Sequence, residues 1–228
     1  MKKIFYQSEW HHIKFSEFTT LSQDRIADSK FYDLFYQNLF KKYRQFDDLD
    51  ANWRKNKEDI GNWLSRYFYS SINILSFGCG LGFLEYYLTK SNPNLNLYIS
   101  DFSEKALKWI KKHVNKEKII TPNLENFHQS FDLIYLSAVD YALDDKELIE
   151  ILISCRKALK KDGQIILISA SYLKSNKIKI LKQDQRWGWL RSRSAYQKIF
   201  LESKFLNSND GFIKHETSDS YFIRAKAS

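Results

Sequence analysis

Three glycines stand at alternate positions in Gly78-Cys79-Gly80-Leu81-Gly82. They follow a short apolar run and precede an amphipathic segment, so the chain is expected to turn there from a strand into a helix. Glycine lets the backbone approach a ligand at the positive end of a helix. Asp101 lies 19 residues after Gly82, where a carboxylate can accept both hydroxyls of a ribose. The pattern predicts a nucleoside site; the alternative is a glycine turn that serves packing alone.

The spacing of the glycines separates two kinds of nucleoside cofactor. A dinucleotide-binding loop has the pattern G-x-G-x-x-G, and its third glycine would fall at position 83, which is Phe83. Here the third glycine is Gly82 and the pattern is G-x-G-x-G. The loop therefore does not have the spacing of a dinucleotide site.

Strand and helix patterns alternate after residue 70, which is typical of an α/β fold with helices on both faces of a parallel sheet. We expect a Rossmann-like, doubly wound, mostly parallel sheet of seven strands, the last two forming a hairpin at one edge. The expected strands cover 72–77, 95–99, 118–120, 131–136, 164–169, 212–215 and 221–225.

Residues 1–70 have helical rather than strand periodicity, with apolar stripes such as Phe31, Leu34, Phe35 and Leu39. We expect an N-terminal helical cap over 1–70 and a cofactor-binding domain over 71–228, with a substrate insertion at about 171–193. Length agrees with this division, since 228 residues with 43% apolar residues fit one globular domain with an extension.

Several classes of protein are disfavoured by composition. No stretch reaches the roughly 18 apolar residues that cross a bilayer, and the start lacks the apolar core of a signal peptide. Cys79 and Cys155 are far apart, which suits a reducing cytoplasm rather than a disulfide framework. No Asp, Glu and His cluster has metal-ligand spacing, so we expect no metal requirement.

The net charge of +9 is concentrated near the C-terminus. Residues 171–228 contain 12 Lys and Arg against 5 Asp and Glu, which would attract an anion. Forked guanidiniums beside indole rings suit a sugar that carries a phosphate or carboxylate. They equally suit bases of single-stranded RNA, and the alternative is a hydrophobic lid. The candidate substrate residues are Arg186, Trp187, Trp189, Arg191 and Arg193.

Four blocks, in the right order over about residues 72–170, resemble the class I S-adenosylmethionine-dependent methyltransferases. They are 74–82 with the glycines, 97–103 with Asp101, 121–124 with Asn123, and 158–165 before the fifth strand. The resemblance implies S-adenosylmethionine as cofactor. It places the methionine part on the glycines, the ribose on Asp101 and the adenine on Phe102 and Asn123, with Ser137 also at the cofactor.

The sequence departs from the family pattern at Ser76, where the family usually has an acidic residue two positions before the first glycine. A hydroxyl can still organise water near the cofactor's ammonium group, but it gives up a charge-assisted hydrogen bond of about 1.5–3 kcal/mol. Ser76 therefore weakens the expectation of tight cofactor binding.

Methyl transfer from a sulfonium mainly requires alignment of the acceptor and exclusion of water. A hydroxyl acceptor also needs a base within hydrogen-bond reach. The candidate bases are Asp140, beyond the fourth strand, and His11 or His12, which belong to a segment that often folds over the cofactor in related enzymes. Tyr141 is a candidate lining residue of the acceptor pocket.

Together these features predict a cytoplasmic enzyme that methylates a hydroxyl, or alternatively an amine, of a small molecule such as an anionic sugar or glycan precursor. One alternative is an RNA-binding methyltransferase that uses the basic C-terminal region. Another is a cofactor-binding protein without catalysis.

Overall fold

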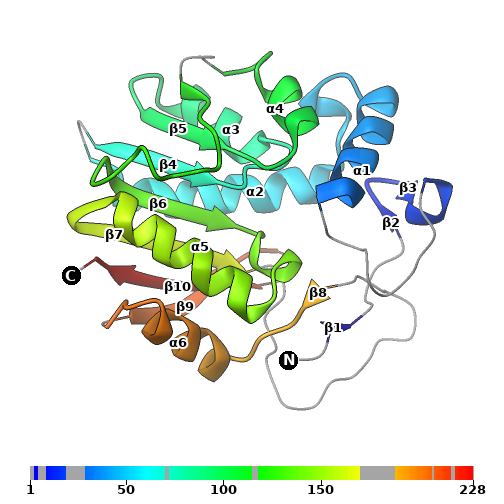
Figure 1. The fold of residues 1–228 in the computed structure, drawn as a ribbon. Helices are drawn as coiled ribbons and strands as arrows, with labels where there is room; N and C mark the ends of the chain where they lie inside the picture. The colour runs from blue at the N-terminus through cyan, green and yellow to red at the C-terminus, as the bar shows by residue number, and fades with distance from the viewer. Residues whose placement is uncertain are drawn as a thin grey trace.

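The structure, a computed structural model, describes residues 3–4, 9–18, 29–69, 72–114, 118–169, 188–206, 208–216 and 219–227. Arg186, Trp187 and most of the predicted insertion lie outside the described residues. Figure 1 shows a central sheet with helices on both faces, which confirms the predicted α/β class.

Among the described residues, the central sheet has six strands in the order β5-β4-β6-β7-β10-β9. The first four run parallel, and β10 is antiparallel to both β7 and β9. The predicted hairpin at one edge is therefore confirmed. The strands are β4 (Asn73–Phe77), β5 (Asn96–Ser100), β6 (Phe131–Ser137), β7 (Leu159–Ser169), β9 (Ser208–Lys214) and β10 (Asp219–Lys226).

The predicted number of seven strands is wrong. The segment expected at 118–120 forms only one parallel bridge, between Ile119 and Ile99, and the N–H of Ile120 donates to the carbonyl of Ile99 at 2.9 Å. In a parallel ladder the next donor on the same strand would be the N–H of residue 122. Pro122 has no N–H to donate, so the pairing stops after one step.

Helices cover both faces of the sheet, because successive side chains of β6 are buried on opposite faces. Ile134 and Leu136 belong to the core on the side of α5 and α6, while Leu133 and Tyr135 belong to the core on the side of α2 and α3. Strand residues alternate between faces with a period of two, so both faces of β6 are buried. The helices are α1 (Ser29–Lys42), α2 (Ala51–Leu64), α3 (Phe83–Ser91), α4 (Glu104–Ile110), α5 (Asp145–Ala158) and α6 (Arg193–Glu202).

Side-chain caps fix two of the helix starts that the sequence predicts. The hydroxyl of Ser103 accepts from the N–H of Ala106, at the start of α4. Asp144 accepts from the N–H of Glu147, whose carboxylate accepts from the N–H of Asp144 in return. Such a reciprocal pair satisfies N–H groups that a helix leaves unpaired.

The N-terminal part of the chain packs against the sheet domain through α1 and α2. The helix α1 contacts α4, and α2 contacts α3 and β9. Short strands β2 (Glu9–Trp10) and β3 (Ile13–Lys14) join α1 in an aromatic cluster, and β1 (Lys3–Ile4) pairs with β8 (Gly188–Trp189). The domain boundary near residue 70 stays a prediction. Within the described part of the chain, no helix is long and apolar enough to cross a membrane.

Candidate functional site

The glycine loop turns β4 into α3 with all three glycines in the left-handed region, at φ +78°, +58° and +73°. Packing also requires a glycine at position 82, because a Cβ there would lie 2.0 Å from Cδ1 of Ile110. Gly82 is absent from the cavity wall described below, whereas Gly78 and Gly80 line it. The loop thus faces the cavity at its first two glycines, whereas the third packs against Ile110.

Asp101 follows the end of β5 and ties the glycine loop to the start of α4. Its Oδ2 accepts from the N–H of Gly80 at 2.7 Å, and its Oδ1 accepts from the N–H of Ser103 at 2.8 Å. Burial raises the pKa of this carboxyl, and the backbone N–H groups oppose that rise. Each oxygen keeps a lone pair for a further donor, so the carboxylate can accept two ribose hydroxyls.

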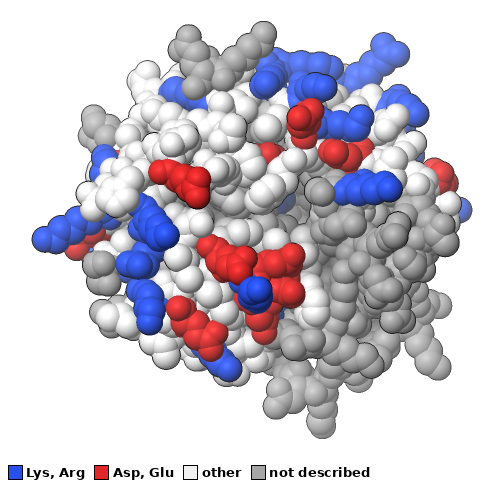
Figure 2. Space-filling model, viewed as in Figure 1, with Lys and Arg blue, Asp and Glu red and all other residues white. Residues whose placement is uncertain are grey.

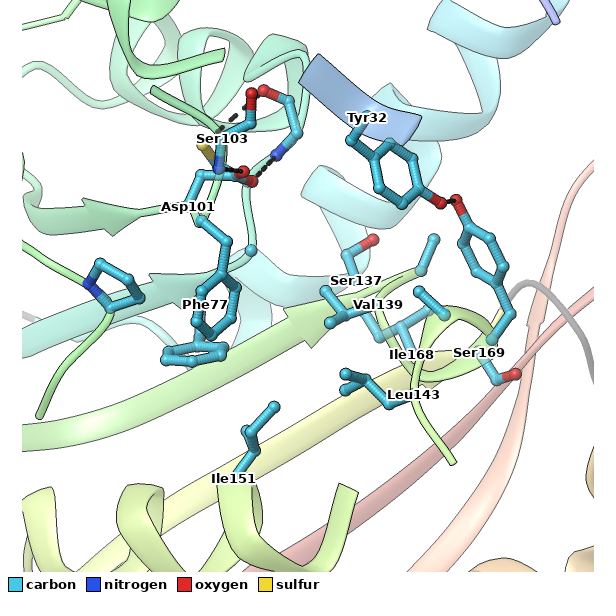
Figure 3. A pocket seen from close by; sticks show the side chains of 18 of the residues that line it. Tyr32, Phe77, Asp101, Ser103, Ser137, Val139, Leu143, Ile151, Ile168 and Ser169 are labelled. Carbon is cyan, nitrogen blue, oxygen red and sulfur yellow. Dashed lines mark hydrogen bonds between the residues drawn. The ribbon is translucent and has the colours of Figure 1, made fainter. Parts of the chain in front are cut away.

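A cavity of about 1170 Å³ lies beside the glycine loop and Asp101, which exceeds the usual 300–1,000 Å³ of a small-molecule site. At one end the ring of Phe102, 56% exposed, meets the edge of Phe77 with centroids 5.8 Å apart. Pro122 and Asn123 line the same end. Figure 3 shows Asp101 and Phe77 on one side of the cavity, with Tyr32, Ser137 and Ser169 on the other.

The other side of the cavity is built from elements far apart in sequence. The hydroxyl of Tyr32, on α1, hydrogen-bonds the hydroxyl of Tyr141 (Figure 3). Lys57, on α2, donates from Nζ to Oγ of Ser137 at 3.1 Å. Trp189 of β8 also lines this side. The positions predicted for Ser137, Tyr141 and Trp189 are thus brought to one cavity.

Sequence reasoning missed Tyr32, Tyr36 and Lys57, which also line the cavity. The apolar stripe of α1 predicted only a packing surface. The two tyrosines stand four residues apart beside that stripe, so they share a face, which is the one signal that could have marked them. Lys57 carries no local signal, because its partner Ser137 is 80 residues away.

Asp140, the predicted base, is fully buried and does not line the cavity. Its Oδ2 accepts from Oγ of Ser169 at 2.7 Å and from the hydroxyl of Tyr196. Burial raises its pKa, and the two hydroxyls and Arg191 oppose that rise. Ser169 lines the cavity, so Asp140 cannot contact an acceptor directly and can reach one only through that hydroxyl.

Arg191 is a correction to the predicted substrate residues. Its side chain is fully buried, and it donates to the backbone carbonyls of Asp140 and Leu143 at 2.6 Å each and to Oδ1 of Asp145 at 2.9 Å. These hydrogen bonds to Asp140, Leu143 and Asp145 fix the loop after β6. Arg193 pairs with Asp210 at 3.0 Å, away from the cavity wall.

The histidines do not face the cavity either. His11 is buried and its ring lies between Trp10 and Trp53, with centroids 4.8 and 4.9 Å away. His12 is exposed, and its carbonyl accepts from Nζ of Lys42 at 2.9 Å. Neither lines the cavity, because the aromatic cluster holds the imidazole of His11 and the backbone turns His12 outward. The structure therefore does not bring either histidine to the cavity wall, and a role of either as base stays a prediction.

Two further predicted residues have protein partners of their own. Ser76 is buried and donates from Oγ to Oε1 of Glu85 at 2.6 Å, so its hydroxyl lies beneath the loop. Asn123 is exposed at the cavity edge, where its amide holds a local turn with Glu125. Within the described residues, no three His, Cys, Asp or Glu side chains gather to hold a metal ion; metal independence stays a prediction.

A strand–glycine–helix turn, a carboxylate after the next strand and an aromatic wall define a nucleoside-binding protein of the Rossmann-like class. Comparison with known proteins narrows this class. Residues 75–165 match a family described as "Methyltransferase domain". The matched segment thus resembles a methyltransferase domain, and the fold is similar to that of class I S-adenosylmethionine-dependent methyltransferases.

Two curated relatives match in sequence. A tRNA N(3)-methylcytidine methyltransferase, trm141 of Schizosaccharomyces pombe, is 40% identical over 161 residues, which are 67% of this chain and 59% of that protein. Ribosomal RNA small subunit methyltransferase C of Pseudoalteromonas translucida is 28% identical over 144 residues, 58% of this chain and 38% of that protein. The chain thus spans about three-fifths of the length of the first relative and about two-fifths of the second.

Solved structures share the fold at low identity. Magnesium protoporphyrin IX methyltransferase of Synechocystis PCC 6803, with bound S-adenosylmethionine, superposes with a TM-score of 0.63 at 16% identity and covers 92% of this chain and 100% of its own. Human N-acetylserotonin methyltransferase, also in complex with S-adenosylmethionine, superposes with a TM-score of 0.62 at 16% identity. The match covers 94% of this chain and 62% of that protein. The family's cofactor fits the residues present: two glycines open to the cavity, a carboxylate with free lone pairs and an exposed aromatic ring.

Proposed function

We propose that this protein transfers the methyl group of S-adenosylmethionine to an oxygen or nitrogen atom of an acceptor bound on the far side of the cavity. The single observation that carries the proposal is the pairing of Asp101 with the N–H of Gly80 at the wall of one large cavity. The cofactor supplies an electrophilic methyl group on a sulfonium, and the acceptor supplies the electron pair.

The cofactor end is assigned to Gly78, Gly80, Asp101 and Phe102, with Asn123 at the adenine edge and Ser137 toward the methyl group. Asp101 would hold the ribose through both carboxylate oxygens. Phe102 would offer its exposed ring to the adenine face. Rigid backbone donors and a fixed carboxylate orient a ligand without reorganising, which is how alignment lowers the barrier of an in-line transfer.

The acceptor end is assigned to Tyr141, Trp189 and the hydroxyl of Ser169. Ser169 donates to Asp140 at 2.7 Å, so its oxygen can accept a proton from the acceptor hydroxyl while its own proton passes to Oδ2 of Asp140. Burial raises the pKa of Asp140, and a raised pKa makes a carboxylate a better proton acceptor. Asp140 then serves as the base through Ser169.

The charge of the acceptor is where the structure changes the expectation. An anionic sugar was predicted from the arginines near residue 190, yet Arg191 is buried and Arg193 lies outside the cavity wall. Among the described wall residues Lys57 is the only basic one, whereas the wall also includes the acidic residues Glu125, Asp144, Glu147, Glu150 and Asp219. Figure 2 shows acidic side chains gathered where α5 begins. These observations favour an uncharged or cationic small molecule.

A second candidate is an RNA acceptor. It is favoured by the two sequence relatives, whose names specify transfer RNA and ribosomal RNA. The acidic residues on the described part of the cavity wall oppose it, because like charge repels phosphate, so we place it second. The cytoplasmic location stays a prediction.

The test is transfer of a labelled methyl group from S-adenosylmethionine to four acceptor sets: phenols and neutral sugars, amines, sugar phosphates, and transfer RNA. We expect label on a neutral or cationic small molecule, with Asp101→Ala as the control that loses transfer. Label on RNA alone would establish the second candidate. Binding of the cofactor without transfer to any set would indicate a non-catalytic protein.

A further inference from the structure

A carboxylate is buried beneath the glycine loop, where the assigned cofactor residues leave it unused. Glu85 stands in the first turn of α3 and is 1% exposed. Its Oε1 accepts from Oγ of Ser76 at 2.6 Å and from the hydroxyl of Tyr135 at 2.9 Å. Its Oε2 has no hydrogen-bond partner among the described residues. We call Ser76, Glu85 and Tyr135 the Glu85 cluster.

Burying this carboxylate is costly, and the fold offsets only part of the cost. Burial raises the pKa of Glu85, while the hydroxyls of Ser76 and Tyr135 and the charge of Lys57 lower it. The positive end of α3 also favours an anion in the first turn. An apolar side chain of similar size would avoid the desolvation penalty altogether. The carboxylate is therefore a charge that packing alone does not need.

The Glu85 cluster lies directly behind the cavity wall. Lys57 and Cys79 both line the cavity, and both interact electrostatically with Glu85. Ser76 is paired in register with Tyr135, two residues before Ser137 on β6, and Lys57 contacts Ser137. The carboxylate thus sits one side chain behind the part of the wall between the loop and Ser137.

That part of the wall is where the amino-acid end of the cofactor must lie, because Asp101 and Phe102 take the nucleoside end. The amino-acid end carries one carboxylate and one ammonium group. Lys57 is the only basic side chain on the described cavity wall, and it can match the carboxylate. Glu85 supplies a negative charge close to it, which can match the ammonium group.

We propose that Glu85 is a positioning residue for the amino-acid end of S-adenosylmethionine, acting through Ser76 and opposite Lys57. The proposal rests on the cofactor assignment made above. The proposal also explains why Ser76 stands where the family usually has an acidic residue. The carboxylate comes from Glu85 on α3 instead, and Ser76 on β4 donates the hydrogen bond that holds it.

The test compares two ligands by calorimetry. S-Adenosylhomocysteine has the amino-acid end, and 5′-methylthioadenosine has the same nucleoside without it. Glu85→Gln keeps the size and the acceptor for both hydroxyls. We expect its Kd for S-adenosylhomocysteine to rise about tenfold, as for loss of a charge-assisted interaction, with the Kd for methylthioadenosine changed by less than about twofold.

Two further variants separate positioning from structure. Glu202→Gln, an exposed residue on α6 paired with Lys198, is the matched control and should change neither Kd. Ser76→Asp added to Glu85→Gln returns a carboxylate to the cluster from β4 and should restore the affinity for S-adenosylhomocysteine. Ser76→Asp alone brings two carboxylates together and should lower the melting temperature.

Equal loss of both ligands in Glu85→Gln, or no loss of either, overturns the proposal, because a purely structural residue does not distinguish the two ligands. Failure of the double variant to recover also contradicts it. If the wild-type protein binds neither ligand, the cofactor assignment itself is wrong. In that case Asp101→Ala also leaves the calorimetric signal unchanged, whereas a correct assignment predicts that it weakens the binding of both ligands.

Discussion

Two buried carboxylates support the two ends of the cavity with the same chemistry. Glu85 accepts from Ser76 and Tyr135, and Asp140 accepts from Ser169 and Tyr196. Each also has one oxygen without a hydrogen-bond partner among the described residues. We call Asp140, Ser169 and Tyr196 the Asp140 cluster.

The two clusters differ in how their parts come together. Glu85 is nine residues from Ser76, across the glycine loop, and 50 residues from Tyr135. Asp140 is 29 residues from Ser169 and 56 from Tyr196, and the loop that carries it is held by Arg191 from 51 residues away. The Glu85 cluster thus has one partner close in the chain, Ser76, whereas both hydroxyl partners of Asp140 lie 29 or more residues away.

The largest effect on stability is expected at Arg191, which holds the loop that carries Asp140. The Glu85 cluster is described without such an arginine. Arg191→Met removes the donors of two backbone carbonyls, and each buried acceptor left unpaired costs about 1–3 kcal/mol. We expect a loss of about 2–5 kcal/mol in the free energy of unfolding, measured by urea titration. Arg193→Met, whose arginine is 62% exposed, should lose about 1 kcal/mol or less.

A variant Arg191→Met that unfolds like the wild type, with weaker acceptor binding alone, would restore Arg191 as a substrate residue. The contrast between the two clusters would then fail.

Gly82 tests the cofactor side, because it begins the helix that carries Glu85. Gly82→Ala places a methyl group 2.0 Å from Cδ1 of Ile110 at φ +73°, and overpacking with a left-handed backbone costs about 2–4 kcal/mol. Gly80→Ala meets only the hydroxyl of Tyr36, at 3.0 Å. It should lose less stability and more cofactor affinity. Unfolding and calorimetry on the pair check this, and equal effects on stability would contradict the packing role of Gly82.

The smallest effect concerns pH. Burial raises the pKa of Asp140 above its usual value near 3.8, so the folded state holds the proton more tightly than the unfolded state. The stability linked to this group is present at low pH and is lost as pH rises through the raised pKa. Relative to the wild type, Asp140→Asn should therefore gain stability as pH rises above the usual pKa of the carboxyl, measured by thermal unfolding.

Glu85→Gln should behave in the same direction, since burial also raises the pKa of Glu85. A stability difference that does not change with pH in either variant would mean that the folded state does not raise the pKa of that carboxyl, and the two clusters would then differ in this property.

What the sequence predicted well was local. The turn from β4 to α3, Asp101 after β5 and the caps Ser103 and Asp144 each depend on residues within a few positions of one another. The edge hairpin was equally visible, because both strands and their turn are adjacent in the chain.

What the sequence did not reveal depends on distant partners. An arginine beside tryptophans is typical of an anion-binding site. Only its hydrogen bonds to backbone carbonyls 48 and 51 residues away show that Arg191 holds a loop. Glu85 looked like an ordinary helix residue until Tyr135 and Ser76 surrounded it. The missing seventh strand follows from the single donor that Pro122 lacks, which a pattern of apolar residues does not register.

The central claim is that the glycine loop and Asp101 bind S-adenosylmethionine, and calorimetric titration tests it most directly. The wild-type protein should bind S-adenosylmethionine and S-adenosylhomocysteine at micromolar concentration and show no binding of NAD, and Asp101→Ala should weaken both by about tenfold or more. Comparable binding of NAD, or unchanged affinity in Asp101→Ala, would contradict the account.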